Sequence, residues 1–170
     1  MKNKNFLITG CAGFIGFHLV KKMINEDINI VGVDNINNYY NVDLKYSRLK
    51  ELGINKEEIG KTEFTQSKIS PKFKFLKLDI SNRSEVEDIF EKENFDYVIN
   101  LAAQAGVRHS IDNPHDYIDS NIVGFINILE GCRKQNIENF IFASSSSVYG
   151  NNREAPFSVT DRVDNPISLY

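Results

Sequence analysis

The sequence predicts an α/β protein built on a Rossmann-like, doubly wound parallel sheet with helices on both faces. Short apolar runs alternate with segments of helical periodicity, which is typical of strands joined by crossover helices. A glycine-rich turn, Gly10 to Gly16, separates the first run from the first helical segment, and Asp34 ends the second run. A chain of 170 residues has the size of one domain, so we expect a single cofactor-binding domain over residues 1–170.

Apolar periodicity predicts at least five strands and three main helices. Strands are predicted from short apolar runs, and helices from apolar residues three and four positions apart. Ser81 or Asn82 is expected to cap the second helix, and Pro114 suits the first position of the third. The expected strands are residues 6–9, 28–33, 73–78, 97–101 and 140–143, and the expected helices are residues 14–25, 82–93 and 114–133.

Each predicted helix carries an apolar stripe. In the second helix, Val86, Ile89 and Phe90 are expected to face the core. The stripe of the first helix comprises Ile15, Leu19 and Met23 with Val20 and Ile24 beside it, and that of the third comprises Ile118, Ile122, Phe125, Leu129 and Cys132.

Residues 35–72 are predicted to form a long polar connection. Such connections are uncommon in compact domains and are often functional. A short helix is expected near residues 44–52. The aromatic residues Tyr39 and Tyr40, near its start, are candidates to cover a bound cofactor.

The composition excludes several classes of protein. Hydrophobic residues make up 41% and charged residues 25%, as in ordinary soluble domains. The net charge of −3 disfavours a nucleic-acid binder, which needs a basic face. No apolar run is long enough for a membrane span, and the N-terminus lacks the features of a signal peptide. The cysteines Cys11 and Cys132 are too few for a disulfide framework, so a reduced, cytoplasmic setting is expected, with no metal site.

The glycine turn predicts a dinucleotide site. Gly10 would permit a tight turn, Gly13 would let the backbone approach a pyrophosphate, and Gly16 would let the helix pack closely. The start of the helix would then offer free N–H groups and a positive dipole to the phosphates. The glycine triplet alone is also consistent with a plain tight turn.

Acidic residues at strand ends strengthen this interpretation. Asp34 can accept hydrogen bonds from an adenosine ribose and would repel a 2′-phosphate, which favours NAD over NADP. The alternative is a solvated aspartate at a strand end. Asp79, which ends the third strand, is either a contact for the adenine edge or the N-cap of the next helix.

Hydroxyl groups follow the last strand. Ser144 to Ser147 stand where ligands bind in parallel sheets, although a polar loop would also explain them. Tyr170 ends the chain. A phenol, with an ordinary pKa of about 10, acts as a base near neutrality only beside positive charge, such as a lysine one helical turn later. The chain stops before that position.

Taken together, these motifs resemble the extended short-chain dehydrogenase/reductase superfamily. Within it, the chain is most similar to NAD-dependent nucleotide-sugar epimerases, and in particular to the UDP-glucuronate 4-epimerase branch. The resemblance extends over essentially all of the chain. The segments that carry it are residues 9–16, 34–40, 101–108, 144–150 and 166–170.

The resemblance implies a role for each of these segments. NAD would be the cofactor, a UDP-sugar the substrate, and a homodimer the assembly of the full-length protein, in polysaccharide biosynthesis. Tyr170 would be the catalytic base and Ser145 would hydrogen-bond the reacting oxygen at the sugar C4. Arg108 is either a sugar-side residue or a surface charge. The implied cofactor contacts are Gly10, Gly13, Phe14, Ile15, Gly16, Asp34, Asn35, Asp79, Ile80, Leu101, Ala102, Ala103, Gln104 and Ser144.

Two departures from the family pattern shape the expected activity. The lysine that should follow Tyr170 and the C-terminal substrate-binding part are missing, so the 170 residues alone are expected to be inactive. Ser146 and Ser147 stand where a 4,6-dehydratase would carry an acidic pair, which favours epimerisation. The alternatives are another epimerase, dehydratase or decarboxylase of the superfamily, or a non-catalytic NAD-binding module.

Overall fold

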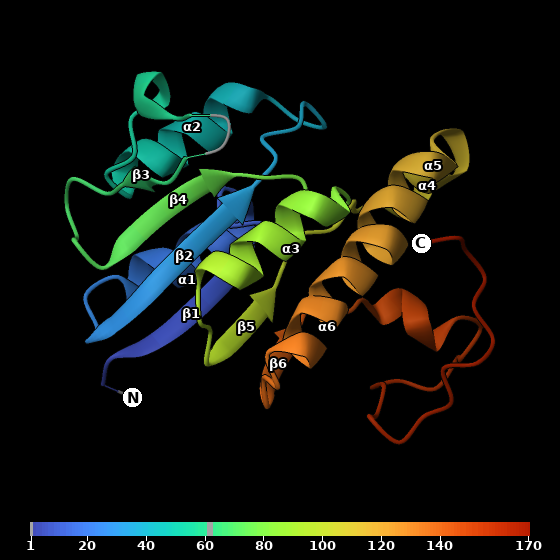
Figure 1. Ribbon diagram of the computed structural model, residues 1–170. Coiled ribbons are helices and arrows are strands. Elements are labelled where there is room, and N and C mark those ends of the chain that lie inside the picture. The colour runs from blue at the N-terminus through green and yellow to red at the C-terminus, as the bar shows by residue number, and fades with distance from the viewer. Residues whose placement is uncertain (1, 61–62) are drawn as a thin grey trace.

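A computed structural model describes residues 2–60 and 63–170 and shows a six-stranded sheet in the order β3-β4-β2-β1-β5-β6 (Figure 1). Neighbouring strands from β4 to β6 pair in parallel, and β3 (Thr65–Gln66) pairs antiparallel with β4 at the edge. The parallel strands are β1 (Lys4–Thr9), β2 (Ile28–Asp34), β4 (Phe73–Lys77), β5 (Tyr97–Asn100) and β6 (Asn139–Phe142).

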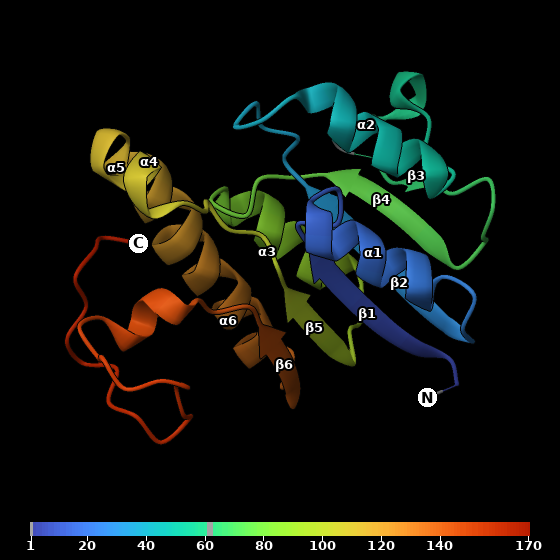
Figure 2. The same cartoon turned by 180° about the vertical axis from the view of Figure 1, so that it is seen from behind.

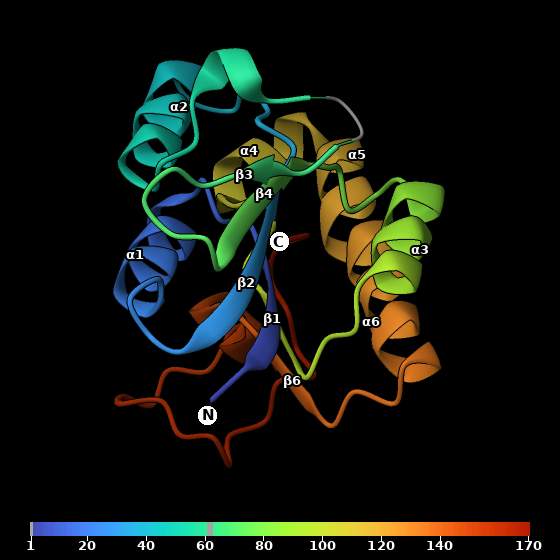
Figure 3. The ribbon, with the colours of Figure 1, turned by 60° about the vertical axis from the view of Figure 1, so that its left-hand side comes forward.

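Helices cover both faces of the sheet. One face carries α1, and the other carries α3 and α6, as Figures 1 and 2 show from opposite sides and Figure 3 shows nearly edge-on. The α-helices are α1 (Phe14–Met23), α2 (Val42–Glu51), α3 (Arg83–Lys92), α4 (Val107–Asp112), α5 (Pro114–Tyr117) and α6 (Phe125–Lys134). Short 3₁₀ helices span Lys56–Glu58 (η1) and Ser146–Tyr149 (η3), and a π-helix spans Ile118–Gly124 (η2).

The sheet separates two apolar cores. Successive side chains of β1 point to opposite faces, so Phe6 and Ile8 pack on the α1 side with Val20. Leu7 packs on the other side with Ile89 of α3. All of these side chains are at most 4% exposed, and this burial anchors the carboxyl ends of the strands on which the site is built.

The predicted fold class is confirmed, and the predicted strands lie within two residues of the observed ones. The connection over residues 35–72 is more structured than expected, because it contains α2, η1 and β3. Residues 61 and 62 of this connection lie outside the described residues. The antiparallel strand β3 was not predicted, since two residues are too short to show a periodicity.

The helix predicted over residues 114–133 is present as one continuous helical segment, but its middle is a π-helix. Its start, α5, leads into the π-helix η2, and α6 begins only at Phe125. A π-helical turn holds an extra residue and rotates the following face. Of the predicted stripe, Ile118 and Ile122 are 37% and 49% exposed, whereas Cys132 is buried, as is Ile128.

The stripe predicted for the first helix is confirmed except at Ile15, because Val20 is buried and Leu19, Met23 and Ile24 pack against the core, and that of the second is confirmed. Ile15 is 62% exposed, and Phe17 and Val20 are the buried apolar residues of α1. In α3 the expected residues, Val86, Ile89 and Phe90, are buried. Among the described residues, no helix is both long enough and apolar enough to cross a lipid bilayer.

Candidate functional site

A cavity of about 290 Å³ lies over the carboxyl ends of the parallel strands. This is the edge at which ligands bind in open α/β sheets. Its wall combines the glycine turn, the end of β2 with the segment that follows, and the loop after β5. The lining residues are Gly10, Gly13, Phe14, Ile15, Gly16, Val33, Asp34, Asn35, Asn37, Tyr39, Tyr40, Lys45, Leu78, Ile80, Leu101, Ala102, Ala103, Gln104, Ala105 and Ser120.

The glycine turn leaves the start of α1 uncovered. Gly10 has a φ of +67°, in the left-handed region that favours glycine. A Cβ at Gly16 would overlap the carbonyl oxygen of Gly10 and lie 2.8 Å from its carbonyl carbon. Gly13 is the N-cap of α1 and makes no side-chain cap. The first-turn amides of α1 therefore lack a capping side chain, as an anion-binding helix start requires.

The carboxylate of Asp34 is buried and faces this turn. Its Oδ2 accepts from the backbone N–H of Ala12 at 3.2 Å, and its Oδ1 accepts from that of Ile36 at 2.9 Å. Asp34 is only 6% exposed, so a solvated aspartate at a strand end, the alternative considered from the sequence, is wrong.

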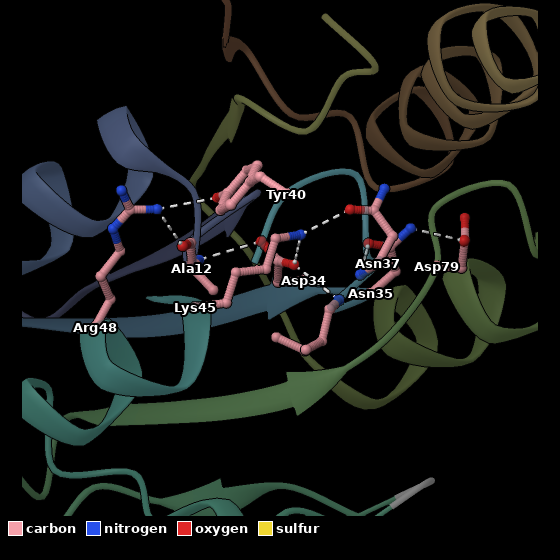
Figure 4. A network of polar contacts seen from close by, with 9 residues as sticks. Ala12, Asp34, Asn35, Asn37, Tyr40, Lys45, Arg48 and Asp79 are labelled. Atoms are coloured by element: carbon pink, nitrogen blue, oxygen red, sulfur yellow. Dashed lines mark hydrogen bonds and ion pairs between the residues drawn. The ribbon is translucent and has the colours of Figure 1, made fainter. Parts of the chain in front are cut away.

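Helix α2 supplies two cations to the cavity region. The Nζ of Lys45 donates to Asp34 Oδ1 at 3.1 Å and to Asn37 Oδ1 at 3.0 Å (Figure 4). Arg48 donates to the carbonyl oxygen of Ala12 at 3.2 Å and to the hydroxyl of Tyr40 at 3.0 Å. Helix α2 therefore ties the connection after β2 to both the acid and the glycine turn.

Asp79 lies in a second, polar hollow that shares Asn35 with the first. Its Oδ2 accepts from Asn35 Nδ2 at 2.9 Å, and its Oδ1 accepts from the backbone N–H and the hydroxyl of Ser81. Partial burial favours the neutral acid, but these hydrogen bonds outweigh it and hold the pKa of Asp79 below its ordinary value. The N-cap of α3 is Asn82, so the helix-cap alternative for Asp79 is wrong.

The loop after β5 is held by two polar side chains. The buried hydroxyl of Thr9 accepts from the backbone N–H groups of Leu101 and Ala102. Asn121, on η2, accepts from the N–H of Gln104 at 2.8 Å and donates to its carbonyl oxygen at 2.9 Å. Among the described residues, Nε2 of the buried Gln104 has no hydrogen-bond partner, although its residue lines the cavity.

Ser144, Ser145 and Tyr170 do not line this cavity. The hydroxyl of Ser145 accepts from the backbone N–H of Ser147 at 3.2 Å and caps η3. Ser144, beside it, is exposed. The ring of Tyr170 packs edge-on against Tyr117, with 5.9 Å between ring centroids. Since Tyr117 donates to the carbonyl oxygens of Ala105 and Gly106, Tyr170 lies near the loop after β5.

The residues present fit a dinucleotide whose adenosine ribose carries no 2′-phosphate, as in NAD. The three glycine positions of the turn have no room for a side chain, and Asp34 stands at the end of β2. Gln104 lines the cavity, and its side-chain Nε2 has no hydrogen-bond partner among the described residues. An unpaired buried amide is unfavourable without a ligand. Within the described residues, no cluster of three or more His, Cys, Asp or Glu side chains is arranged to hold a metal ion.

Sequence reasoning placed most of the cavity wall but missed several of its residues. All predicted cofactor contacts except Asp79 and Ser144 line the cavity, and Asp79 lines the adjoining hollow. Tyr39 and Tyr40 line it as anticipated. Lys45 was missed because a lysine in a polar segment has the pattern of a surface residue. Thr9 and Asn121 were missed because their partners are backbone groups far along the chain.

Comparisons with known proteins found a matching family model and similar proteins. Residues 6–170 match the model of the NAD dependent epimerase/dehydratase family. The chain is 53% identical over 164 residues to Protein CapI of Staphylococcus aureus, covering 96% of the chain and 44% of that protein. It is 41% identical over 165 residues to the UDP-glucuronate 4-epimerase of Thermodesulfobacterium geofontis, covering 97% of the chain and 46% of that protein.

A solved structure has the same fold. The UDP-Glc/GlcNAc 4-epimerase of Campylobacter jejuni superposes with a TM-score of 0.81 at 28% identity, covering 99% of this chain and 45% of that one. The chain thus spans less than half the length of each of these proteins. The similarity extends from the glycine turn to Tyr170.

Proposed function

Since this chain belongs to the NAD dependent epimerase/dehydratase family, we propose that it forms the cofactor-binding part of a nucleotide-sugar 4-epimerase. The proposed reaction interconverts UDP-glucuronate and UDP-galacturonate. The observation that carries the proposal is the cavity over the glycine turn, with the buried carboxylate of Asp34 in its wall. The choice of sugar is supported by the similarity to a UDP-glucuronate 4-epimerase.

In this proposal the chain binds the cofactor along the cavity. The amides at the start of α1 hold the pyrophosphate, Asp34 and Asn35 hold the adenosine ribose, and Asp79 and Ile80 flank the adenine. The loop after β5 lines the path to the nicotinamide, together with Ser144. When bound, NAD supplies a reversible hydride acceptor, so that a sugar carbon oxidised on one face can be reduced on the other.

Tyr170 and Ser145 are the proposed reactive side chains. The phenolate of Tyr170 takes the proton from the C4 hydroxyl of the sugar and becomes the phenol, and Ser145 hydrogen-bonds the same oxygen. Removal of that proton raises the electron density on the oxygen and favours departure of the hydride from C4. Neutral side chains at Ser146 and Ser147 supply no acid or base for elimination of water, so the proposed outcome is epimerisation.

The proposed assembly is a homodimer in the cytoplasm. Ile118 and Ile122 of η2 and Ile126 of α6 are between 37% and 53% exposed, and contact with a second subunit would remove this apolar surface from water. The two cysteines are free and buried, as in a protein that does not depend on disulfides. Light scattering of the purified full gene product measures the assembly directly.

The decisive assay incubates the full gene product with UDP-glucuronate and, separately, with UDP-glucose, and identifies the sugars by NMR. The expected product is UDP-galacturonate from the first substrate only. Epimerisation of UDP-glucose alone would reassign the substrate. Binding of NAD without turnover of either sugar would favour the non-catalytic module. The 170 residues by themselves are expected to give no product, since relatives of this chain are more than twice as long.

A further inference from the structure

The segment between β2 and α2 forms a strap over the cavity. This strap, residues 36–41, leaves the end of β2 and extends toward α4 before the chain turns into α2 (Figures 1 and 2). Its two tyrosines, Tyr39 and Tyr40, line the cavity. Asn38 and Tyr39 are also exposed, so the strap stands between the cavity and solvent.

The base of the strap is fixed in an unusual conformation. Ile36 has a φ of +54°, which is an outlier for a β-branched residue. Its N–H donates to Asp34 Oδ1 at 2.9 Å, and the residue is 7% exposed. Asn37 donates its N–H to Asn35 Oδ1 at 3.0 Å and accepts from Lys45 Nζ at 3.0 Å. Such strain persists only where the surroundings over-determine the backbone, and it is typical of functional segments.

One latch joins the strap to the glycine turn. Arg48 of α2 donates to the hydroxyl of Tyr40 at 3.0 Å and to the carbonyl oxygen of Ala12 at 3.2 Å (Figure 4). Its guanidinium carbon also lies 5.7 Å from the ring centroid of Tyr40 and 5.9 Å from that of Phe14, within the range of cation–π attraction. Arg48 therefore connects the strap to the start of α1.

A second latch joins the strap to the loop after β5. The ring of Tyr39 packs against that of His109 in α4, with 4.9 Å between the ring centroids. The hydroxyl of Tyr39 lies so close to Gly106 that a Cβ on this glycine would be 2.8 Å from it. Tyr39 and Tyr40 thus contact two different walls of the cavity, and the strap closes across it.

Apart from these latches, the tip of the strap has little to hold it. Within the part of the chain that the structure describes, residues 38–40 make no hydrogen bond between backbone groups. Segments with few buried contacts and exposed backbone open locally at a small cost in free energy. The two tyrosine latches therefore decide whether the tip is open or closed, while the base stays in place.

We propose that the strap is a gate for the dinucleotide and that its two latches set the rate of cofactor exchange, an inference that rests on the proposed function. Entry and exit both require Tyr39 and Tyr40 to leave their partners. A weaker latch makes the open strap more populated whether or not the cavity is occupied, so association and dissociation become faster together. The dissociation constant, which is the ratio of the two rate constants, then stays nearly the same.

The test measures both rate constants for the full gene product, freed of cofactor, with NADH as the fluorescent probe. Stopped-flow mixing gives the association rate, and displacement of bound NADH by excess NAD gives the dissociation rate. Tyr40→Phe removes the hydrogen bond from Arg48 and should raise both rates by about fivefold, the effect of one typical hydrogen bond. Tyr39→Leu removes the ring contact with His109 and should raise both rates by about threefold.

Tyr46→Phe is the matched control, because Tyr46 lies on the same helix as Arg48 but packs against the core and does not line the cavity. It should leave both rates unchanged. Faster dissociation of the Tyr40→Phe variant without faster association would mark Tyr40 as an ordinary cofactor contact and overturn the gate, although the proposed function would stand. Unchanged rates in both strap variants would also overturn the gate. If the unmodified protein binds neither NADH nor NAD, the proposed function is wrong as well.

Discussion

Replacement of Thr9 by valine tests how the fold holds the loop that lines the cavity. Thr9 is fully buried, at 0% exposure. Its hydroxyl donates to Asn100 Oδ1 at 2.6 Å and accepts from the N–H groups of Leu101 and Ala102 at 3.1 and 3.0 Å. A hydroxyl has one donor and two acceptor positions, so all of them are used. Valine keeps the shape of the side chain and removes all three bonds.

The expected loss of stability follows from the groups left behind. A buried polar group without a partner costs about 1–3 kcal/mol, and a hydrogen bond that water can replace costs about 1 kcal/mol. Asn100 is buried, whereas the two loop amides belong to half-buried residues. The sum is a decrease of about 3–5 kcal/mol in the free energy of unfolding. The loop should also become less ordered and NAD binding weaker, because the loop lines the cavity.

Urea unfolding followed by circular dichroism measures this loss, with Thr9→Ser as the matched control. Serine keeps the three hydrogen bonds and removes one methyl group, at a cost of about 1 kcal/mol. A Thr9→Val variant within about 0.5 kcal/mol of the unmodified chain would refute the argument. So would a Thr9→Ser variant as unstable as Thr9→Val, since packing of the methyl group would then be responsible.

Three further predictions concern the turn, the thiols and the adenine side. Gly16→Ala should abolish NAD binding and destabilise the fold by about 1–3 kcal/mol, whereas Gly60→Ala, whose Cβ would lie 3.6 Å from the nearest atom of the described residues, should do neither in calorimetry and urea unfolding. Burial raises the pKa of Cys132 to about 11, and both thiols are buried. Neither thiol should therefore react with a disulfide reagent at pH 8 until urea unfolds the chain. Reaction of the folded chain as fast as that of an exposed thiol would contradict this prediction. Asn35→Ala should raise the depressed pKa of Asp79 and lower the melting temperature of the chain. The decrease in melting temperature should reach its full size above the ordinary carboxyl pKa of about 3.9 and shrink as the pH falls through the pKa of Asp79 in the folded state. A decrease that does not depend on pH would argue against the Asn35 contact.

Local sequence patterns were sufficient to predict the order of the strands and helices and the glycine turn of the site. Glycines at positions 10, 13 and 16 after an apolar run indicate a turn that only glycine permits, because the first has a positive φ and a Cβ at the third would overlap the first. Asp34 was recognisable because the parallel fold brings strand ends to one edge. The family expected from these motifs is confirmed over residues 6–170.

Helix faces were predicted less well, because their phase depends on contacts between distant segments. Apolar spacing from Ile118 to Cys132 suggested a single buried stripe, but Ile118 and Ile122 lie in the π-helix η2 and are partly exposed, whereas Cys132 is buried. Within this π-helix, Asn121 bonds the backbone N–H and carbonyl oxygen of Gln104. A single-sequence periodicity contains no information about such a partner.

The sequence by itself therefore determined the fold class, the glycine turn and the acid at the end of β2, since each rests on backbone geometry or on residues close along the chain. Only the tertiary structure decided that Thr9 and Asn121 hold the loop after β5 and that Lys45 is buried against Asp34. Hydroxyl, amide and ammonium groups are ordinary surface groups in a sequence. They become specific only when folding removes water and leaves one partner within reach.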